Sequence, residues 1–210
     1  MGRFMNHKKL VVALALIATA LILTHLPVSE ADAAASASDF LIEGSTLTKY
    51  RGTDERVTIP DTVEVVGESA FENNQKVQFV VVPKSVKRLD AYVFWGCNNL
   101  EEVVLGKGLT SVDEYAFSGC TGLKQITIPE NVQSIDVQAF AGCTNLTDIY
   151  IPDTVTSIAD DAFLNCDNVT IHADEGSVAE KFAQKLAEQK SQRCRVLRDK
   201  AIVRVSMLPR

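Results

Sequence analysis

The sequence predicts a repeat solenoid that is mainly β, with short parallel strands and a C-terminal capping helix. Three residue types recur with a common step of 23 residues. The phenylalanine series is Phe71, Phe94, Phe117, Phe140 and Phe163. The proline series is Pro60, Pro83, Pro129 and Pro152, with Gly106 in the third place, and the cysteine series is Cys97, Cys120, Cys143 and Cys166, preceded by Asn74. Because chance does not produce three such registers together, the chain is built from internal repeats.

Each repeat contains one strand, which ends at the proline. Apolar residues alternate with other residues just before it, as at Val103 and Leu105 or at Ile126 and Ile128. This two-residue period and the β-branched side chains favour a half-buried strand over a helix. The equivalent positions in the other repeats are Val57, Ile59, Val80, Val82, Ile149 and Ile151. Proline then ends the strand because it cannot donate to the hydrogen-bond ladder.

The rest of each repeat is predicted to return to the next strand without a helix, for which 23 residues leave little room. A turn carrying one apolar residue comes first, and a short segment around an Ala-Phe pair then closes the coil. The apolar residues of this turn are Val66, Leu89, Val112, Ile135 and Ile158. No single coil buries its own apolar columns, so stacking must create one continuous core. Each large side chain buried there contributes roughly 1.5 to 3 kcal/mol.

The repeat resembles that of a known family. The segment Ala116-Phe117-Ser118-Gly119-Cys120-Thr121-Gly122-Leu123-Lys124-Gln125-Ile126-Thr127-Ile128-Pro129 looks like the repeat of BspA-like bacterial leucine-rich-repeat surface proteins. The resemblance covers residues 57–173 as a leucine-rich-repeat solenoid of about five 23-residue repeats, and departs from the pattern at Asn74, Gly106 and Val93. It implies a secreted or wall-associated adhesin that binds host proteins or other cells, with no enzymatic activity attached to the repeat.

The N-terminus is predicted to be a secretory signal peptide over residues 1–33. Basic residues precede an apolar run of 17 residues from Leu10 to Leu26, and small residues follow it. This order is typical of export signals, with Ala31-Asp32-Ala33 or Ala35-Ser36-Ala37 as the cleavage site. An uncleaved anchor is the alternative, because the run spans about 25 Å as a helix against a bilayer core near 30 Å. The protein is therefore expected to be secreted or cell-surface-associated, with membrane contact only through an uncleaved signal sequence.

Segments outside the repeat are predicted to close both ends of the stack. Residues 34–56 are interpreted as a linker and N-terminal cap, with Phe40, Ile42 and Leu47 as its apolar contacts. Val169 and Ile171 begin a sixth strand, after which the periodicity stops. Residues 174–192 are predicted to form a capping helix, which begins at the capping-box pair Ser177 and Glu180. Its apolar face carries Ala179, Phe182, Ala183 and Leu186. A basic tail, residues 193–210, follows.

Charge is divided unevenly along the chain. Residues 57–173 carry 6 Lys and Arg against 16 Asp and Glu, whereas residues 174–210 carry 9 against 5. An acidic body thus precedes a basic tail. Nucleic-acid binding is not expected of this body, because neutralising phosphates needs clustered basic side chains.

The cysteine series is predicted to be a ladder of buried thiols. Cysteines in an exported protein suggest disulfides, and neighbouring coils are close enough for one. Parallel side-chain directions make the disulfide torsion hard to reach, however, and Asn74 in the first copy fits a ladder in which thiols or amides meet backbone polar groups. Disulfide pairing and metal binding remain the alternatives. Cys194 lies outside the ladder, as a single thiol or an intermolecular partner.

Catalysis and cofactor binding find no support in the motifs. His172 is the only histidine after the signal segment, and no P-loop, GxGxxG, HExxH or GxSxG pattern occurs. The acidic pairs Asp160-Asp161, Glu101-Glu102 and Asp113-Glu114 lack the dense spacing of calcium ligands and are interpreted as solvated faces. We therefore expect no enzyme, no metal and no cofactor.

The outward side of the strands is the predicted protein-binding surface. Strand alternation assigns eight residues to it: Phe79, Val81, Glu102, Val104, Gln125, Thr127, Asp148 and Tyr150. Several are apolar or aromatic, as is common at binding surfaces. The competing interpretation is that strands simply favour such residues. Trp95 occupies a variable and therefore solvent-facing position, as a contact anchor or an incidental exposed side chain.

Two functions follow as hypotheses. The first is protein-protein binding or adhesion through the strand face, with a host extracellular protein or another cell-surface protein as ligand. The alternative is a non-catalytic, cell-wall-associated scaffold that docks on anionic wall polymers through the basic tail.

Overall fold

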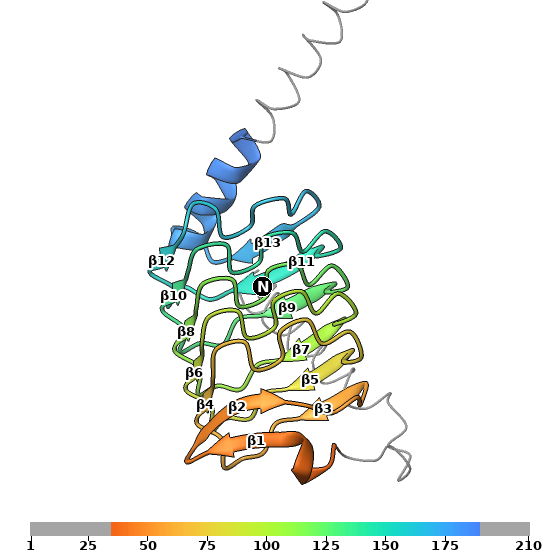
Figure 1. Cartoon of the computed structure of the whole chain (residues 1–210). Coiled ribbons are helices and arrows are strands. Elements are labelled where there is room, and N and C mark those ends of the chain that lie inside the picture. Colours follow the sequence, from red (N-terminus) through yellow and green to blue (C-terminus); the bar gives the residue numbers. More distant parts are fainter. Residues whose placement is uncertain (1–34, 190–210) are drawn as a thin grey trace, which may run out of the picture. The chain divides into compact units, whose positions relative to one another are not determined.

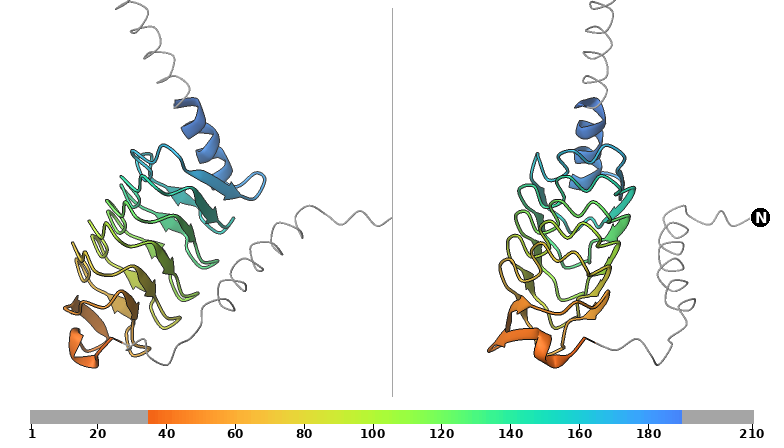
Figure 2. Two further views of the ribbon diagram at one scale, coloured as in Figure 1. Left: turned by 90° about the vertical axis from the view of Figure 1, so that its right-hand side faces the viewer. Right: turned by 45° about the vertical axis from the view of Figure 1, so that its right-hand side comes forward.

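The computed structural model describes residues 35–189 (Figure 1). The predicted signal peptide and the basic tail with Cys194 lie outside the described residues. Within them, the chain winds into stacked coils followed by a helix over residues 178–189 (Figure 2). This architecture confirms the predicted solenoid with parallel strands and a C-terminal helix.

Two sheets run along the stack. The six-stranded sheet contains β3 (Arg56–Thr58), β5 (Phe79–Val81), β7 (Glu102–Val104), β9 (Gln125–Thr127), β11 (Asp148–Ile151) and β13 (Thr170–Ala173), which are the predicted strands. Neighbouring strands are parallel, and Val57 pairs with Val80, which pairs with Val103. The register therefore advances by one 23-residue repeat per coil.

The second sheet was not predicted. It contains β4 (Val65–Val66), β6 (Arg88–Leu89), β8 (Ser111–Val112), β10 (Ser134–Ile135) and β12 (Ser157–Ile158), preceded by the hairpin strands β1 (Phe40–Glu43) and β2 (Thr46–Tyr50). The expectation of a simple turn around Val66, Leu89 and their equivalents was therefore wrong. Strands of two residues are too short to show a two-residue period in the sequence. Each coil thus has strands on two sides instead of one.

Consecutive turns close the third side of each coil, as the short repeat predicts. In one coil, Ser118 N–H donates to the Tyr115 carbonyl at 3.0 Å and Cys120 N–H donates to the Phe117 carbonyl at 3.1 Å. Tyr115 and Gly119 have φ of 56° and 76°. These left-handed residues prevent the turns from continuing as a helix. Residues equivalent to Gly119 in the other coils are Asn73, Gly96, Gly142 and Asn165, which are types that tolerate this conformation.

The core is organised around a row of stacked phenylalanine rings. Ring centroids of neighbouring phenylalanines lie 5.0 to 5.3 Å apart from Phe71 to Phe163. Rings from outside the repeat extend the row at both ends, with Tyr50 4.9 Å from Phe71 and Phe182 5.7 Å from Phe163. Each such pair contributes about 0.5 to 1.5 kcal/mol beyond its buried area. Aromatic stacking therefore joins the repeats to both terminal segments.

The terminal segments bury the ends of this core. A short 3-10 helix, η1 (Ala37–Asp39), leads into the β1–β2 hairpin, which adds β2 to the seven-stranded sheet and buries Leu47. At the other end, Ala179 and Phe182 of the helix are buried. The helix begins as the sequence predicts, because Glu180 N–H donates to Ser177 Oγ at 3.1 Å. The Glu180 carboxylate accepts in return from Gly176 N–H at 2.6 Å.

The cysteine series forms the predicted ladder of buried thiols. Each thiol donates to the carbonyl of the phenylalanine 26 residues earlier, so that Cys97 Sγ lies 3.0 Å from the Phe71 oxygen. Cys120, Cys143 and Cys166 repeat this bond at 2.9 to 3.2 Å. Burial raises the pKa of Cys97 to about 12. The thiols thus satisfy backbone carbonyls inside the coil and resist ionisation.

We expect the free energy of unfolding to fall above pH 9 because of this ladder. The unfolded chain ionises its thiols near their ordinary pKa of 9.0, whereas folded Cys97 keeps its proton to about pH 12. Stability is therefore intact below pH 9, and each such thiol removes up to about 1.4 kcal/mol per pH unit above it. Urea unfolding under reducing conditions between pH 8 and pH 10 measures this slope. Cys97→Ser keeps a donor without an ionisable thiol, and equal slopes in both proteins would contradict the prediction.

Candidate binding face of the six-stranded sheet

The outward side chains of the six-stranded sheet form two columns, which we call the strand face. One column contains Arg56, Phe79, Glu102, Gln125, Asp148 and Thr170, and the other contains Thr58, Val81, Val104, Thr127, Tyr150 and His172. All eight residues predicted from strand alternation lie here. Inward neighbours such as Val80 and Ile126 are buried, which accounts for the alternation.

Four strand-face residues escaped the sequence analysis. They are Arg56 and Thr58 on the first strand and Thr170 and His172 on the last. The signal that identifies them is the same alternation, since each pair flanks a core position, Val57 or Ile171. The terminal strands therefore extend the face by one coil at each end.

The first end of the strand face combines a cation with apolar groups. The Arg56 guanidinium carbon lies 4.2 Å from the centre of the Phe79 ring. Such a contact contributes about 0.5 to 1 kcal/mol where it is exposed. Val104, two coils further, is 39% exposed and remains open to a ligand. This end presents a positive charge beside an apolar stripe.

The other end is an aromatic cluster held by an acid. The rings of Tyr150 and His172 stack with centroids 4.3 Å apart and planes 12° from parallel. His172 Nε2 lies 2.7 Å from Asp148 Oδ1, and this hydrogen bond lowers the pKa of Asp148 below its ordinary value. The histidine that the sequence left as an isolated surface residue therefore orients the tyrosine at the end of the face.

Strand pairing weakens in the middle of the face. Between β7 and β9 only Glu102 and Gln125 are in register, whereas β5 and β7 pair over three residues. The irregularity coincides with Gly106, which replaces the proline of the other repeats. The face therefore consists of two regular patches, one around Phe79 and one around Tyr150.

A polar hollow of about 420 Å³ adjoins the starts of β5 and β7. It is lined by Gln78, Asn98, Asn99, Glu101, Thr121, Gly122 and Asn145. Several of these groups already have partners within the chain: Asn99 donates to the Gln75 carbonyl at 2.8 Å, and Glu101 pairs with Lys124. The hollow therefore stabilises neighbouring coils against one another.

The position of Trp95 corrects one expectation. Trp95 is 38% exposed, as predicted, and Leu164 in the same column is 40% exposed. The column is not uniformly solvent-facing, however, because Ser118 is 9% and Ala141 is 7% exposed. Variability at this position thus reflects differences in side-chain size as well as solvent contact.

Two further properties bear on the kind of site. Among residues 35–189, no group of three or more His, Cys, Asp or Glu side chains is arranged to hold a metal ion. In the same part of the chain, no helix is long and apolar enough to cross a membrane. The strand face is thus described by its shape, aromatic groups and charge.

The repeat geometry corresponds to a known family. The sequence model described as BspA type leucine rich repeat region matches residues 49–170. The chain belongs to this BspA-type leucine-rich-repeat family. The match contains six copies instead of the five marked by phenylalanine. It begins just before Tyr50, which continues the phenylalanine row without keeping the 23-residue step.

Solved structures of bacterial leucine-rich-repeat proteins resemble this BspA-type chain. A leucine rich cell surface protein from Faecalibacterium prausnitzii shares 33% identity with a TM-score of 0.62, over 66% of this chain and 37% of that protein. A leucine-rich-repeat protein from T. pallidum shares 27% identity with a TM-score of 0.64, over 66% of this chain and 70% of that one. The pneumococcal vaccine antigen PcpA shares the fold at 19% identity, with a TM-score of 0.56 over 65% of this chain and 35% of the antigen. A search of curated proteins finds no match.

Proposed function

We propose that the chain is a secreted or cell-surface leucine-rich-repeat protein that binds a protein ligand through the strand face. The observation that carries this proposal is the row of apolar and aromatic side chains left at the surface by a core that is already complete. Phe79, Val81, Val104 and Tyr150 point outward while the inward positions of the same strands are buried. Exposed apolar groups flanked by charges are typical of protein-binding surfaces.

The charges at the strand face suit an amphipathic partner. Arg56 lies at one end, and Glu102 and Asp148 lie along the same column. Aromatic side chains flanked by such groups commonly supply most of the binding energy of an interface. The resemblance to a bacterial cell surface protein supports an extracellular setting, in which a host protein or a protein of another cell is the ligand.

Replacing Tyr150 or Phe79 with alanine is expected to weaken ligand binding about tenfold or more, because loss of an aromatic anchor costs more than about 1 kcal/mol. Thermal stability should change little, since both side chains lie outside the core. The measurement is the affinity of the mature protein, residues 34–210, for a panel of purified host extracellular proteins and for isolated cell walls, at two salt concentrations.

Tyr92→Ala provides the matched control. Tyr92 stacks on Tyr115 with ring centroids 4.8 Å apart, outside the strand face. The variant loses the same side chain as Tyr150→Ala and should keep full affinity. Unchanged binding in both Tyr150→Ala and Phe79→Ala would refute the strand face as the binding site.

A further inference from the structure

A second concave surface lies on a different side of the coils from the strand face. This groove, of about 420 Å³, follows the ends of β8, β10 and β12 and is lined by Ala91, Asp113, Glu114, Asp136, Val137, Ser157 and Ala159. Its walls combine three carboxylates with three apolar side chains. Val137 is 41% exposed, the largest value among the exposed large apolar side chains of the described residues. The groove is thus both acidic and incompletely covered.

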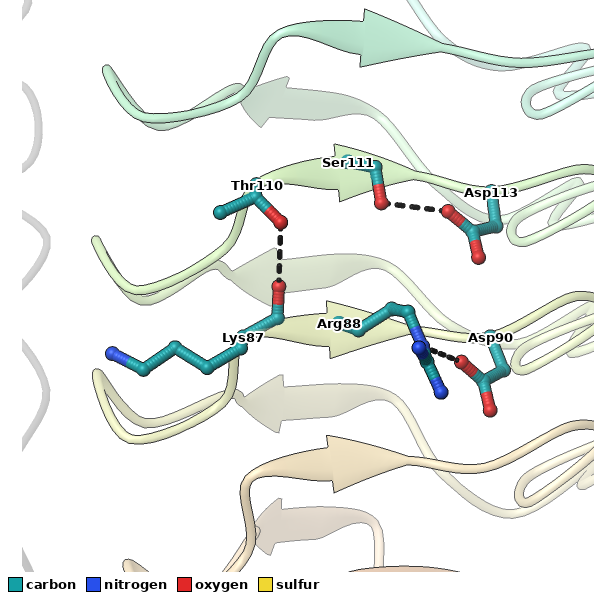
Figure 3. Close-up of polar contacts among 6 residues, drawn as sticks. All are labelled: Lys87, Arg88, Asp90, Thr110, Ser111 and Asp113. Atoms are coloured by element: carbon teal, nitrogen blue, oxygen red, sulfur yellow. Dashed lines mark hydrogen bonds and ion pairs between the residues drawn. The ribbon is translucent and has the colours of Figure 1, made fainter.

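The negative charge of the groove is only partly compensated. One coil earlier, Arg88 forms an ion pair with Asp90 (Figure 3). Serine replaces this arginine in the next two coils, and Ser111 Oγ donates to Asp113 Oδ1 at 2.7 Å (Figure 3). A hydroxyl orients a carboxylate without neutralising it. Within residues 35–189, no Lys or Arg forms an ion pair with the groove carboxylates, although Arg88 attracts Asp113 from the neighbouring coil.

The carboxylates of the groove also repel one another. Asp113 and Asp136 are equivalent residues of consecutive coils, which lie about 4.8 Å apart. Partial burial, and then the charge of Asp113, raise the pKa of Asp136 above its ordinary value. A cation placed between the two carboxylates would relieve this repulsion. An arginine or lysine suits the groove because its aliphatic stem packs on apolar walls while its head meets the acids.

The C-terminal part of the chain already makes a contact of this type. Lys185 of the helix donates to Asp160 Oδ1 at 2.6 Å. Asp160 stands one repeat beyond Val137, so this ion pair lies one coil from the groove wall. Figure 1 shows the helix, in blue, on the side of β12. The segment that follows the helix therefore starts close to the groove.

The composition of that segment complements the groove. Residues 190–210 carry 7 Lys and Arg against 1 Asp, whereas residues 35–189 carry 11 against 24. Val196, Leu197, Ile202 and Val203 lie between the basic residues and supply apolar side chains. The groove lies about two coils, or roughly 10 Å, from Asp160, and an extended residue spans about 3.3 Å. A few residues beyond the helix therefore suffice to reach it.

We propose that the groove binds the basic C-terminal segment of the same chain, residues 190–210. Its arginine or lysine side chains lie among Asp113, Glu114 and Asp136, and its apolar residues cover Val137 and the adjacent alanines. The contact neutralises part of the acidic body and shields an exposed apolar side chain. It also withdraws the tail from anionic wall polymers and leaves the strand face open.

The test uses the full mature chain with a fluorescent label on Cys194. The label is directed there because the ladder thiols are buried. Docking predicts high anisotropy of the label that falls when salt rises from about 0.1 M to about 1 M, which shortens the Debye length from about 10 Å to about 3 Å. The groove variant, Asp113→Asn with Glu114→Gln and Asp136→Asn, should show the high-salt anisotropy already at low salt.

The control variant carries the same change in charge elsewhere. It combines Asp61→Asn, Glu130→Gln and Asp153→Asn, three exposed positions on the turns that follow the prolines. It should behave like the wild type. Equal anisotropy of the groove and control variants overturns the proposal, and anisotropy that depends on protein concentration overturns docking within one chain. If circular dichroism shows that the groove variant is unfolded, the single change Glu114→Lys at an exposed position replaces it.

Discussion

Replacing Phe117 with alanine is expected to lower the free energy of unfolding by about 3 to 5 kcal/mol. The ring is fully buried and stacks on two neighbours, with centroids 5.2 Å from Phe94 and 5.3 Å from Phe140. The variant loses both stacking contacts and leaves a cavity at the middle of the core. A loss of this size is a large fraction of the stability of a typical domain, which is about 5 to 15 kcal/mol.

The position of Phe117 enlarges the effect. In a solenoid each coil contacts only its neighbours, so a weakened central coil uncouples the two halves of the stack. We expect urea unfolding, followed by circular dichroism, to become less cooperative as well as to shift to lower urea. Phe79→Ala removes the same side chain from the strand face and should cost at most about 1 kcal/mol. Equal losses in the two variants would show that the phenylalanine row does not carry the fold.

Restoring the repeat pattern with Gly106→Pro is expected to destabilise the protein by about 1 to 3 kcal/mol, the usual cost of overpacking. Proline occupies this position in the other repeats, so the pattern alone suggests that the change is favourable. A Cβ atom on Gly106, however, would lie 2.4 Å from the Pro83 carbonyl oxygen. Because the obstacle is backbone, the coil itself must move.

The neighbouring residues confirm that this coil lies unusually close to the preceding one. A Cβ atom on Gly108 would lie 2.1 Å from the Lys84 carbonyl oxygen. Gly106→Ala separates the causes, because alanine adds the Cβ atom and keeps the backbone N–H. Both variants should lower the urea midpoint by similar amounts. A loss confined to Gly106→Pro would instead assign the effect to the proline ring or to the missing N–H.

The two-sheet coil separates two surfaces of opposite character. The strand face carries aromatic and apolar side chains in two columns, whereas the groove beside the seven-stranded sheet carries clustered carboxylates. A ligand on one surface does not occupy the other. The proposed binding function and the proposed docking of the C-terminal segment therefore fail or succeed in separate experiments.

The repeat pattern was sufficient to predict the core, the ladder and the strand face. Equivalent positions recur every 23 residues, so Phe117 and Cys120 identify their counterparts in every coil. Strand alternation then separates inward Val103 from outward Val104. These features depend on local periodicity, which the sequence displays directly.

The second sheet and the aromatic ends of the core were not apparent from the pattern. Strands of two residues have no readable period, and Tyr50 and Phe182 lie outside the 23-residue step. Their contacts with the phenylalanine row arise from the path of the terminal segments. Arg56 and His172 were missed for a related reason, because they belong to end strands that carry only part of the repeat.

What the sequence by itself determined is the stack: its step, its buried columns and the outward residues of its longer strands. The tertiary structure decided which of the remaining residues meet. The groove draws Ala91, Glu114, Val137 and Ala159 from four successive repeats, and the Lys185–Asp160 pair joins the helix to the same side. Periodicity identifies equivalent positions, but contacts between coils, and between coils and caps, depend on the path of the chain through space.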